Sequence, residues 1–142
     1  MIYIDTSALV PVLMPEARSM VVRAWFRRLN LGEAAVSAWT IVEFASALGI
    51  KVRSRAASAE AAAHANAAFQ RLARKSLSII VPTHRDFLDA AQHLEEFDLG
   101  LRGGDALHLA IAHNRRASSL VTLDNRLARA AGRLGLACEM PA

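Results

Sequence analysis

The 142-residue sequence predicts an α/β protein with three layers, α/β/α, around a central, mostly parallel sheet of four to five strands. Short β-branched runs alternate with helix-forming segments along the chain, and strands that alternate with helices usually form a parallel sheet covered on both faces. Hydrophobic residues make up 54% of the chain, which is enough for one sizeable core. We therefore expect a single domain spanning residues 1–142.

Five segments have the composition of strands. The first, residues 2–4, is β-branched and aromatic, and turn-forming residues follow it, so this strand should end at Asp5. The third candidate, residues 77–81, is closed by Pro82, which cannot continue a central strand. The second and fourth candidates are residues 34–37 and 120–123, and a short fifth run lies at 136–138.

Helices are expected between these strands. A short helical turn should cover residues 8–13, and Pro15 and Glu16 resemble the first turn of a helix that ends near residues 30–32. The alanine-rich segment 54–75 should form one helix or a pair. Other helices should follow residue 37, the capping-box-like sequence 83–86 and Asp124, and the helix 106–114 is apolar almost all round, which predicts a buried position.

The composition limits the location and the chemistry. No apolar run approaches the roughly 20 residues that a membrane helix needs, and no basic leader precedes the first strand, so we expect a cytoplasmic protein without membrane contact. The single cysteine, Cys138, offers neither an internal disulfide nor a multi-cysteine metal site, and it reads as a small buried residue. Redox chemistry is therefore not expected.

Basic residues exceed acidic ones, 17 to 13, for a net charge of +4, and 15 of the 17 are arginines. Arginine binds phosphate through two parallel hydrogen bonds, so this surplus favours a polyanionic partner such as a nucleic acid. A genome rich in G and C would also enrich arginine and alanine. Composition alone leaves both explanations open.

Four carboxylates, those of Asp5, Glu43, Asp105 and Asp124, lie where strands end or helices begin. A doubly wound sheet gathers its ligands outside the carboxyl ends of its strands, so these acids should converge in one pocket. Converging acids repel one another unless a divalent cation neutralises them, and an all-oxygen site suits Mg²⁺ or Mn²⁺ rather than Zn²⁺. The chemistry that fits such a site is phosphodiester hydrolysis.

Each acid also has an ordinary structural explanation. Asp5, Asp105 and Asp124 stand where helix-capping acids occur, which stabilise a helix by roughly 0.5–2 kcal/mol. Glu43 follows Thr40 at the spacing of a capping box, and for Glu43 the two explanations are equally good. Capping does not require the four acids to converge, so their shared sheet edge favours a common site.

The residues around these acids resemble the ordered motifs of the PIN-domain family, and within it most closely the VapC-type toxins of type II toxin-antitoxin modules. Any one motif is weak, but four in order at compatible spacing are specific, and they span the chain from Asp5 to Asp124. The motifs are residues 5–9 (Asp-Thr-Ser-Ala-Leu), Glu43 within residues 40–45, residues 104–110 (Gly-Asp-Ala-Leu-His-Leu-Ala) and residues 122–124 (Thr-Leu-Asp).

The resemblance implies roles for individual residues. Asp5, Glu43 and Asp105 match the family's three most regular acids and Asp124 matches a more variable fourth, with Asp5, Asp105 and Asp124 as metal ligands. The hydroxyl residues Thr6, Ser7 and Thr122 match positions that help to organise the metal and its water. Leu127 replaces the aromatic residue usual after the fourth acid, a change that should affect packing more than chemistry.

Two residues beside the third acid have less certain roles. Arg102 is placed to contact a substrate phosphate, although a solvated surface arginine would look the same in the sequence. His108 lies one helical turn after Asp105 and could approach the site, but an ordinary histidine bonded within the core explains it equally well.

The resemblance further implies an RNA substrate, hydrolysis to a 5′-phosphate and a 3′-hydroxyl, a homodimer, and inhibition by a VapB-like antitoxin in a toxin-antitoxin hetero-oligomer. Two alternatives within the fold are a PIN nuclease that processes RNA outside a toxin-antitoxin module and a catalytically inactive interaction module. A receiver domain fits poorly because no acids precede Asp5, and a dehalogenase-like phosphatase would need an acid where Ser7 stands. No phosphate-binding Gly-x-x-x-x-Gly-Lys loop is present.

Overall fold

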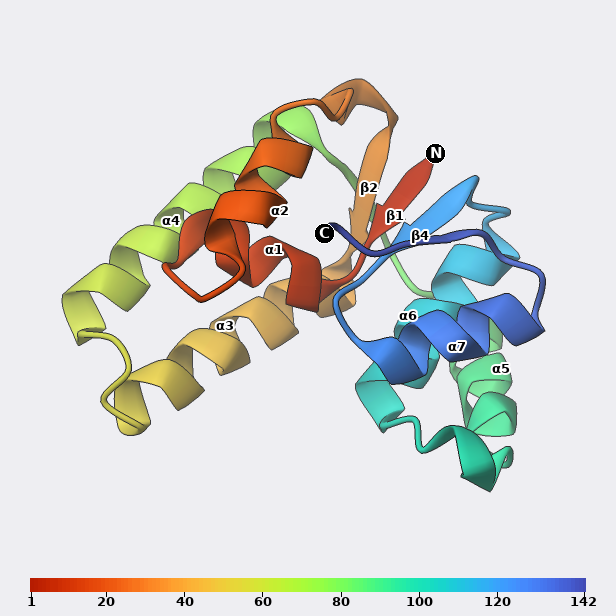
Figure 1. Cartoon of the computed structure of the whole chain (residues 1–142). Helices are drawn as coiled ribbons and strands as arrows, with labels where there is room; N and C mark the ends of the chain where they lie inside the picture. The colour runs from red at the N-terminus through yellow and green to blue at the C-terminus, as the bar shows by residue number, and fades with distance from the viewer.

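Five short strands form one parallel sheet at the centre of the computed structural model, which describes residues 1–142 (Figure 1). The strand order is β3-β2-β1-β4-β5, and all four neighbouring pairs are parallel. The strands are β1 (Ile2–Ile4), β2 (Ala34–Ser37), β3 (Ser78–Ile80), β4 (Ser119–Val121) and β5 (Cys138–Glu139). Helices cover both faces, so the predicted three-layer α/β/α fold is confirmed.

The helices are divided between the two faces in chain order, and the two groups lie on opposite sides of the sheet in Figure 1. One face carries α1 (Thr6–Leu13), α2 (Ser19–Phe26), α3 (Ala38–Arg53) and α4 (Ala59–Ser76); the other carries α5 (His84–Leu94), α6 (Gly103–Asn114) and α7 (Asn125–Arg133). None of these helices is both long enough and apolar enough to cross a bilayer.

Each face of the sheet has its own hydrophobic core because successive side chains of a strand point to opposite faces. In β1, Ile4 joins the core beneath α1–α4, whereas Tyr3 joins the core beneath α5–α7. Within the first core, Phe44 of α3 stacks on Phe69 of α4 with ring centroids 4.4 Å apart. Helix α6 is buried along nearly its whole length, as its apolar sequence predicts.

The chain reverses its direction across the sheet between β1 and β4. It passes from β1 outward to β2 and β3, and then returns to place β4 on the other side of β1. The backbone N–H of Asp5 donates to the carbonyl of Val121, 2.9 Å away, so the carboxyl ends of the two strands meet. Ligands of such sheets bind at this reversal point, outside the carboxyl ends.

The helix expected from Pro15 to residues 30–32 is much shorter in the structure. The Ser19 hydroxyl accepts from the backbone N–H of Glu16 and donates to the carbonyl of Met14, which holds residues 14–19 in a turn before α2 begins. Helix α2 ends at Phe26, and a 3₁₀ turn (Leu31–Glu33) follows. A second correction concerns Cys138, which is half-buried at the edge strand β5 rather than fully inside the core.

Candidate metal centre

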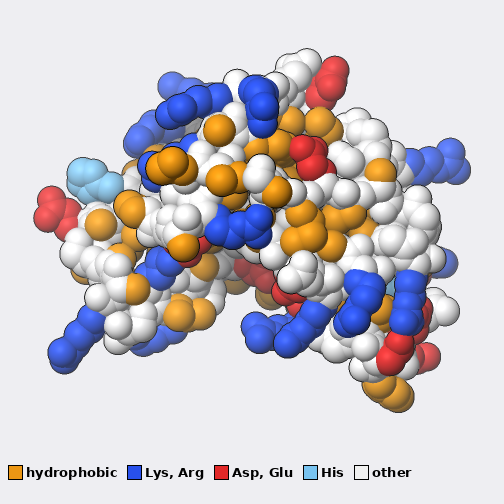
Figure 2. Space-filling view, in the orientation of Figure 1, with side chains coloured by type: hydrophobic (Ala, Val, Ile, Leu, Met, Phe, Trp, Pro, Cys, Tyr) orange, Lys and Arg blue, Asp and Glu red, His pale blue; other side chains and the backbone are white.

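All four candidate acids line one cavity of about 400 Å³ at the carboxyl end of the sheet. Asp5 ends β1, Glu43 lies on α3, Asp105 in the first turn of α6, and Asp124 directly before α7. Figure 2 shows a hollow with acidic side chains at its base, between α3 and the helices α6 and α7, and with Lys and Arg side chains on both sides. Residues separated by more than 100 positions thus meet at the reversal point of the sheet.

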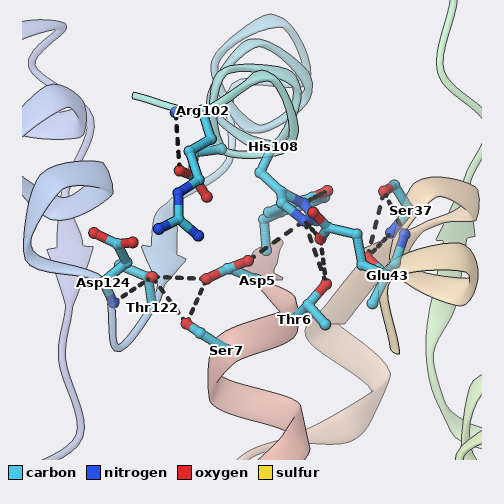
Figure 3. A network of polar contacts seen from close by, with 12 residues as sticks. Asp5, Thr6, Ser7, Ser37, Glu43, Arg102, His108, Thr122 and Asp124 are labelled. Carbon is cyan, nitrogen blue, oxygen red and sulfur yellow. Dashed lines mark hydrogen bonds and ion pairs between the residues drawn. The ribbon is translucent and has the colours of Figure 1, made fainter. Parts of the chain in front are cut away.

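Asp5 is almost fully buried, and two hydroxyls hold its carboxylate (Figure 3). Ser7 Oγ donates to Asp5 Oδ2 at 2.5 Å, and Thr122 Oγ1 donates to the same oxygen at 2.7 Å. Asp5 stands at the N-cap position of α1, yet its side chain makes no capping hydrogen bond. The capping explanation is therefore wrong for Asp5, whose carboxylate is oriented toward the cavity instead.

The same two hydroxyls connect Asp5 to the segment that carries Asp124. Ser7 Oγ accepts from the backbone N–H of Leu123, and Thr122 Oγ1 accepts from that of Asp124. Asp124 caps α7, because its Oδ1 accepts from the backbone N–H groups of Arg126 and Leu127 at 2.7 and 3.3 Å. Both bonds end at Oδ1, so Oδ2 of Asp124 is available to a ligand in the cavity.

Glu43 does not belong to a capping box. Ser37 caps α3 and pairs with Thr40, and Glu43 lies a turn further along the helix. Its Oε2 accepts from Thr6 Oγ1 at 2.7 Å and contacts His108 Nε2 at 2.5 Å. Burial acts to raise the pKa of Glu43, but the bonds from His108 and Thr6 outweigh it, so the pKa is lowered and the group is a carboxylate at neutral pH.

The structure decides between the two interpretations of His108 left open by the sequence, because this buried histidine contacts the site acids directly. It is fully buried, with Nδ1 2.7 Å from the Tyr3 hydroxyl and Nε2 directed at Glu43 and, 3.4 Å away, at Asp5. Burial acts to lower the pKa of His108, but the hydrogen bond to Glu43 and the neighbouring negative charges raise it overall. In the sequence, the signal for this position of His108 is its place one helical turn after Asp105.

Asp5, Glu43 and His108 offer ligand atoms that all lie within 4.8 Å of one another, a possible alternative metal set. Carboxylates accept hydrogen bonds only, so Nε2 of His108 must carry the proton in the bond to Glu43. In the neutral ring Nδ1 then accepts from Tyr3, and in the charged ring both nitrogens donate. Because Nε2 is a donor in either case, we assign His108 to holding Glu43 rather than to binding a metal.

The charge on Asp105 is opposed by its surroundings. Burial and the neighbouring charges of Asp124, Asp5 and Glu43 raise the pKa of this carboxyl, although its bond from the backbone N–H of Arg102 acts against them. A divalent cation in the cavity would remove this repulsion. The donor set is made of carboxylate oxygens, which suits Mg²⁺ or Mn²⁺.

Arg102 lies at the mouth of the same cavity. Its side chain is exposed, and Figure 3 shows the guanidinium directed into the space between Asp5 and Asp124. It forms no ion pair with any acid. Leu127, which stands where the resemblance led us to expect an aromatic residue, is fully buried in the core beneath α7 and fills a packing position away from the acids.

Gly104 lets the start of α6 approach Glu43 closely. A Cβ at this position would collide with Oε1 of Glu43 and lie 3.2 Å from Nε1 of Trp39, whereas a Cβ at Gly103 would meet nothing within 4 Å. Glu43 has little freedom to retreat because Thr6 and His108 both hold its other oxygen.

We therefore expect Gly104→Ala to displace Glu43 and to lower the turnover of the phosphodiester hydrolysis expected from the sequence by roughly 10- to 100-fold, since a displacement near 1 Å can cost that much. Gly103→Ala is the matched control and should retain wild-type turnover. Steady-state cleavage assays on both variants test this. Equal activity of the two variants would show that the close approach at Gly104 is unimportant.

Comparisons with known proteins agree with this geometry. The sequence profile described as "PIN domain" matches residues 2–133. The chain is 32% identical over 145 aligned positions to Ribonuclease VapC35 of Mycobacterium tuberculosis, and the alignment covers 99% of this chain and 97% of the relative.

Solved structures show the same fold. VapC20 of Mycobacterium tuberculosis, described as a sarcin-ricin loop cleaving toxin, superposes with a TM-score of 0.73 at 18% identity, covering 92% of this chain and 95% of that one. FitAcB from Neisseria gonorrhoeae superposes with a TM-score of 0.71 at 20% identity, covering 99% and 98%. A toxin-antitoxin complex from Klebsiella pneumoniae gives 0.69 at 17% identity, covering 100% and 98%. The solved structures share the fold, and the profile match over residues 2–133 together with the 32% identical relative shows that the chain belongs to the PIN-domain family.

Proposed function

We propose that this protein is a VapC-type toxin, a Mg²⁺- or Mn²⁺-dependent endoribonuclease that hydrolyses RNA phosphodiester bonds. The observation that carries the proposal is the convergence of Asp5, Glu43, Asp105 and Asp124 in one cavity, where burial and then the neighbouring negative charges raise the pKa of Asp105. The name of the curated relative, a ribonuclease, supports RNA as the substrate. An RNA substrate also agrees with the cytoplasmic location expected from the sequence.

The roles of the acids follow from their free oxygens. Asp5, Asp105 and Asp124 would hold the cation, and Ser7 and Thr122 keep Asp5 in place through its Oδ2. Glu43 is fixed through Oε2, so its Oε1 is the oxygen that can orient a water or accept its proton. A bound divalent cation supplies positive charge that lowers the pKa of water and stabilises charge developing on the phosphate.

The surroundings of the acids suit a polyanionic substrate. Apart from the four site acids, the chain has nine acidic residues and 17 basic ones. Lys and Arg side chains lie on both sides of the hollow in Figure 2. Such a surface attracts a nucleic acid through counterion release, so binding should weaken steeply as salt increases. Arg102, exposed and free of ion pairs at the cavity mouth, would contact a phosphate beside the scissile bond.

We further propose that a VapB-like antitoxin inhibits the protein and that the toxin forms homodimers within a toxin-antitoxin hetero-oligomer. Support comes from structures of the same fold, among them the complex from Klebsiella pneumoniae and a DNA-bound VapBC from Salmonella typhimurium, which is 16% identical with a TM-score of 0.67. The 142 residues would act as a single nuclease domain.

Metal titration of the purified chain tests the proposal. Mn²⁺ at 100 times its dissociation constant should stabilise the wild type by about 2.7 kcal/mol and should switch on cleavage of an RNA pool over the same concentration range. Asp5→Asn should lose both effects, while Asp98→Asn, an exposed acid outside the cavity, should keep both. An RNA pool left intact by the wild type with either metal would instead support an inactive interaction module.

A further inference from the structure

A second cavity, of about 410 Å³, adjoins the metal centre on the side of α1 and α3. Four residues line both cavities, namely Ser7, Val10, Ala47 and Ile50. The remaining walls of the second cavity are formed by Glu16, Lys51 and Leu123. The two cavities are therefore adjacent and share a wall that includes Ser7, which Figure 3 shows beside Asp5.

The lining of this second cavity is mainly apolar, and each of its polar side chains is already engaged by another group. Val10, Ala47, Ile50 and Leu123 form its apolar walls, and Ile50 is 56% exposed. The Ser7 hydroxyl already donates to Asp5 and accepts from the backbone of Leu123. Lys51 and Glu16 form an ion pair at the far end. A ligand here would be held by apolar contact rather than by specific hydrogen bonds.

We propose that this cavity binds the base of a nucleotide next to the scissile phosphate, an inference that rests on the proposed nuclease function. A strand with its phosphate at the acids must place a neighbouring base within reach of the adjoining space. The cavity lies within the size range of small-molecule sites, and aliphatic walls can pack against the face of a base through dispersion contacts. Arg102 lines the cavity of the acids but not this second one, so the strand would pass from Arg102 across the acids toward the second cavity.

Two properties of the substrate follow from this placement. A base that leaves its stack to enter the cavity cannot be paired, so cleavage should require an unpaired nucleotide at that position. Because the polar side chains of the lining are paired with other groups, Ser7 with Asp5 and Lys51 with Glu16, the presence of a base should matter more than its identity. The cavity thus selects single-stranded or looped RNA at the cleavage point without reading its sequence there.

The test uses short RNA oligonucleotides built around a cleavage site mapped in an RNA pool. In two substrates, the base on one side or the other of the scissile phosphate is replaced by an abasic ribose. Removing the base that enters the cavity should lower kcat/KM for the wild-type protein several-fold, because the apolar surface of that base is then no longer buried against the cavity walls. Exchanging that base for another should change kcat/KM by much less.

Ile50→Ala tests whether the cavity is responsible. This variant should cleave the intact substrate several-fold more slowly than the wild type, and it should lose most of the discrimination against the abasic substrate. Val42→Ala is the matched control, because Val42 lies on the same helix, is 57% exposed and lines neither cavity. Val42→Ala should keep both the wild-type rate and the discrimination.

The outcomes separate the two levels of the proposal. Suppose that the wild type cleaves RNA, but that the abasic ribose lowers kcat/KM by the same factor in Ile50→Ala as in the wild type, so that the two losses multiply. The base-binding inference is then wrong, while the nuclease function stands. Multiplying losses are also the result expected if the cavity receives a protein side chain. If the wild type cleaves no RNA with Mg²⁺ or Mn²⁺, the proposed function fails and the base-binding inference fails with it.

Discussion

Asp105→Asn should abolish metal-dependent RNA cleavage, with a loss of at least about a hundredfold, while the protein stays folded. The amide keeps the shape of the carboxyl and can still accept from the backbone N–H of Arg102, but it cannot supply the negative charge that holds a divalent cation. Cleavage assays on RNA with Mg²⁺ and with Mn²⁺ measure the loss. A variant that cleaves at the wild-type rate would remove Asp105 from the metal site.

Thermal unfolding of the same variant separates a metal ligand from a structural acid. Burial and, after it, the charges of the other three acids raise the pKa of Asp105, so without metal its negative charge is unfavourable and removing it should leave the melting temperature unchanged or higher. With Mn²⁺ the order should reverse, because only the wild type gains stability from binding. A melting temperature that falls without metal would instead point to a structural role.

Asp86→Asn should cause the largest loss of stability of any single change considered for this chain, about 3 kcal/mol. Asp86 is fully buried at the start of α5, where it accepts from the backbone N–H and hydroxyl of Thr83, from Asn114 and from Arg115. An asparagine turns an NH₂ group toward these donors and removes the charge partner of Arg115. Urea unfolding measures the loss, and Asp98→Asn, at an exposed ion pair, is the control that should change stability far less.

The stabilisation from Asp86 should depend on pH with a definite sign. Burial acts to raise the pKa of Asp86, but the hydrogen bonds from Thr83 and Asn114 and the charge of Arg115 lower it overall. A group with a lowered folded-state pKa stabilises fully above its unfolded value, near 3.9, and loses this contribution as the pH falls through the folded value. The difference between wild type and Asp86→Asn should therefore shrink below about pH 4. A difference that is constant from pH 7 to pH 3 would contradict this assignment.

The positions of the strands were predictable because local composition and topology act together. Asp5 follows the β-branched strand β1, and Asp124 comes shortly after β4, which pairs in parallel with β1. The rules of parallel sheets therefore bring the two acids to the same edge. The start of α5 after Thr83 was also predictable, since Asp86 accepts from the backbone N–H of Thr83 as the acid of a capping box does. In these cases the determining contacts are close in sequence or are imposed by the sheet.

The contacts around Glu43 were not predictable, because they depend on partners far apart in the chain. The pairing of Ser37 with Thr40 removes Thr40 from a capping box with Glu43, and Thr6 and His108 then hold the Glu43 carboxylate across 37 and 65 residues of sequence. His108 in turn depends on Tyr3, 105 residues away. No periodicity or spacing in the sequence records such side-chain contacts.

The early end of the helix expected after Pro15 has a similar physical cause. The Ser19 hydroxyl competes for the backbone groups of Met14 and Glu16 and stabilises a turn where apolar periodicity alone favours helix. Asp124 shows that the two explanations for an acid can both hold, because one of its oxygens caps α7 while the other faces the cavity. Capping positions and metal-binding positions coincide at the carboxyl end of this sheet.

The chemistry of the cleaved ends tests the central claim most directly, namely that the four acids form a metal centre that hydrolyses RNA. Purified wild-type protein should cut an RNA pool only when Mg²⁺ or Mn²⁺ is present, leaving 5′-phosphate and 3′-hydroxyl ends, because water rather than the 2′-hydroxyl of the RNA attacks the phosphorus. The Asp105→Asn protein, purified identically, should leave the pool intact. Cleavage that persists in EDTA, or fragments that end in 2′,3′-cyclic phosphates, would contradict the claim.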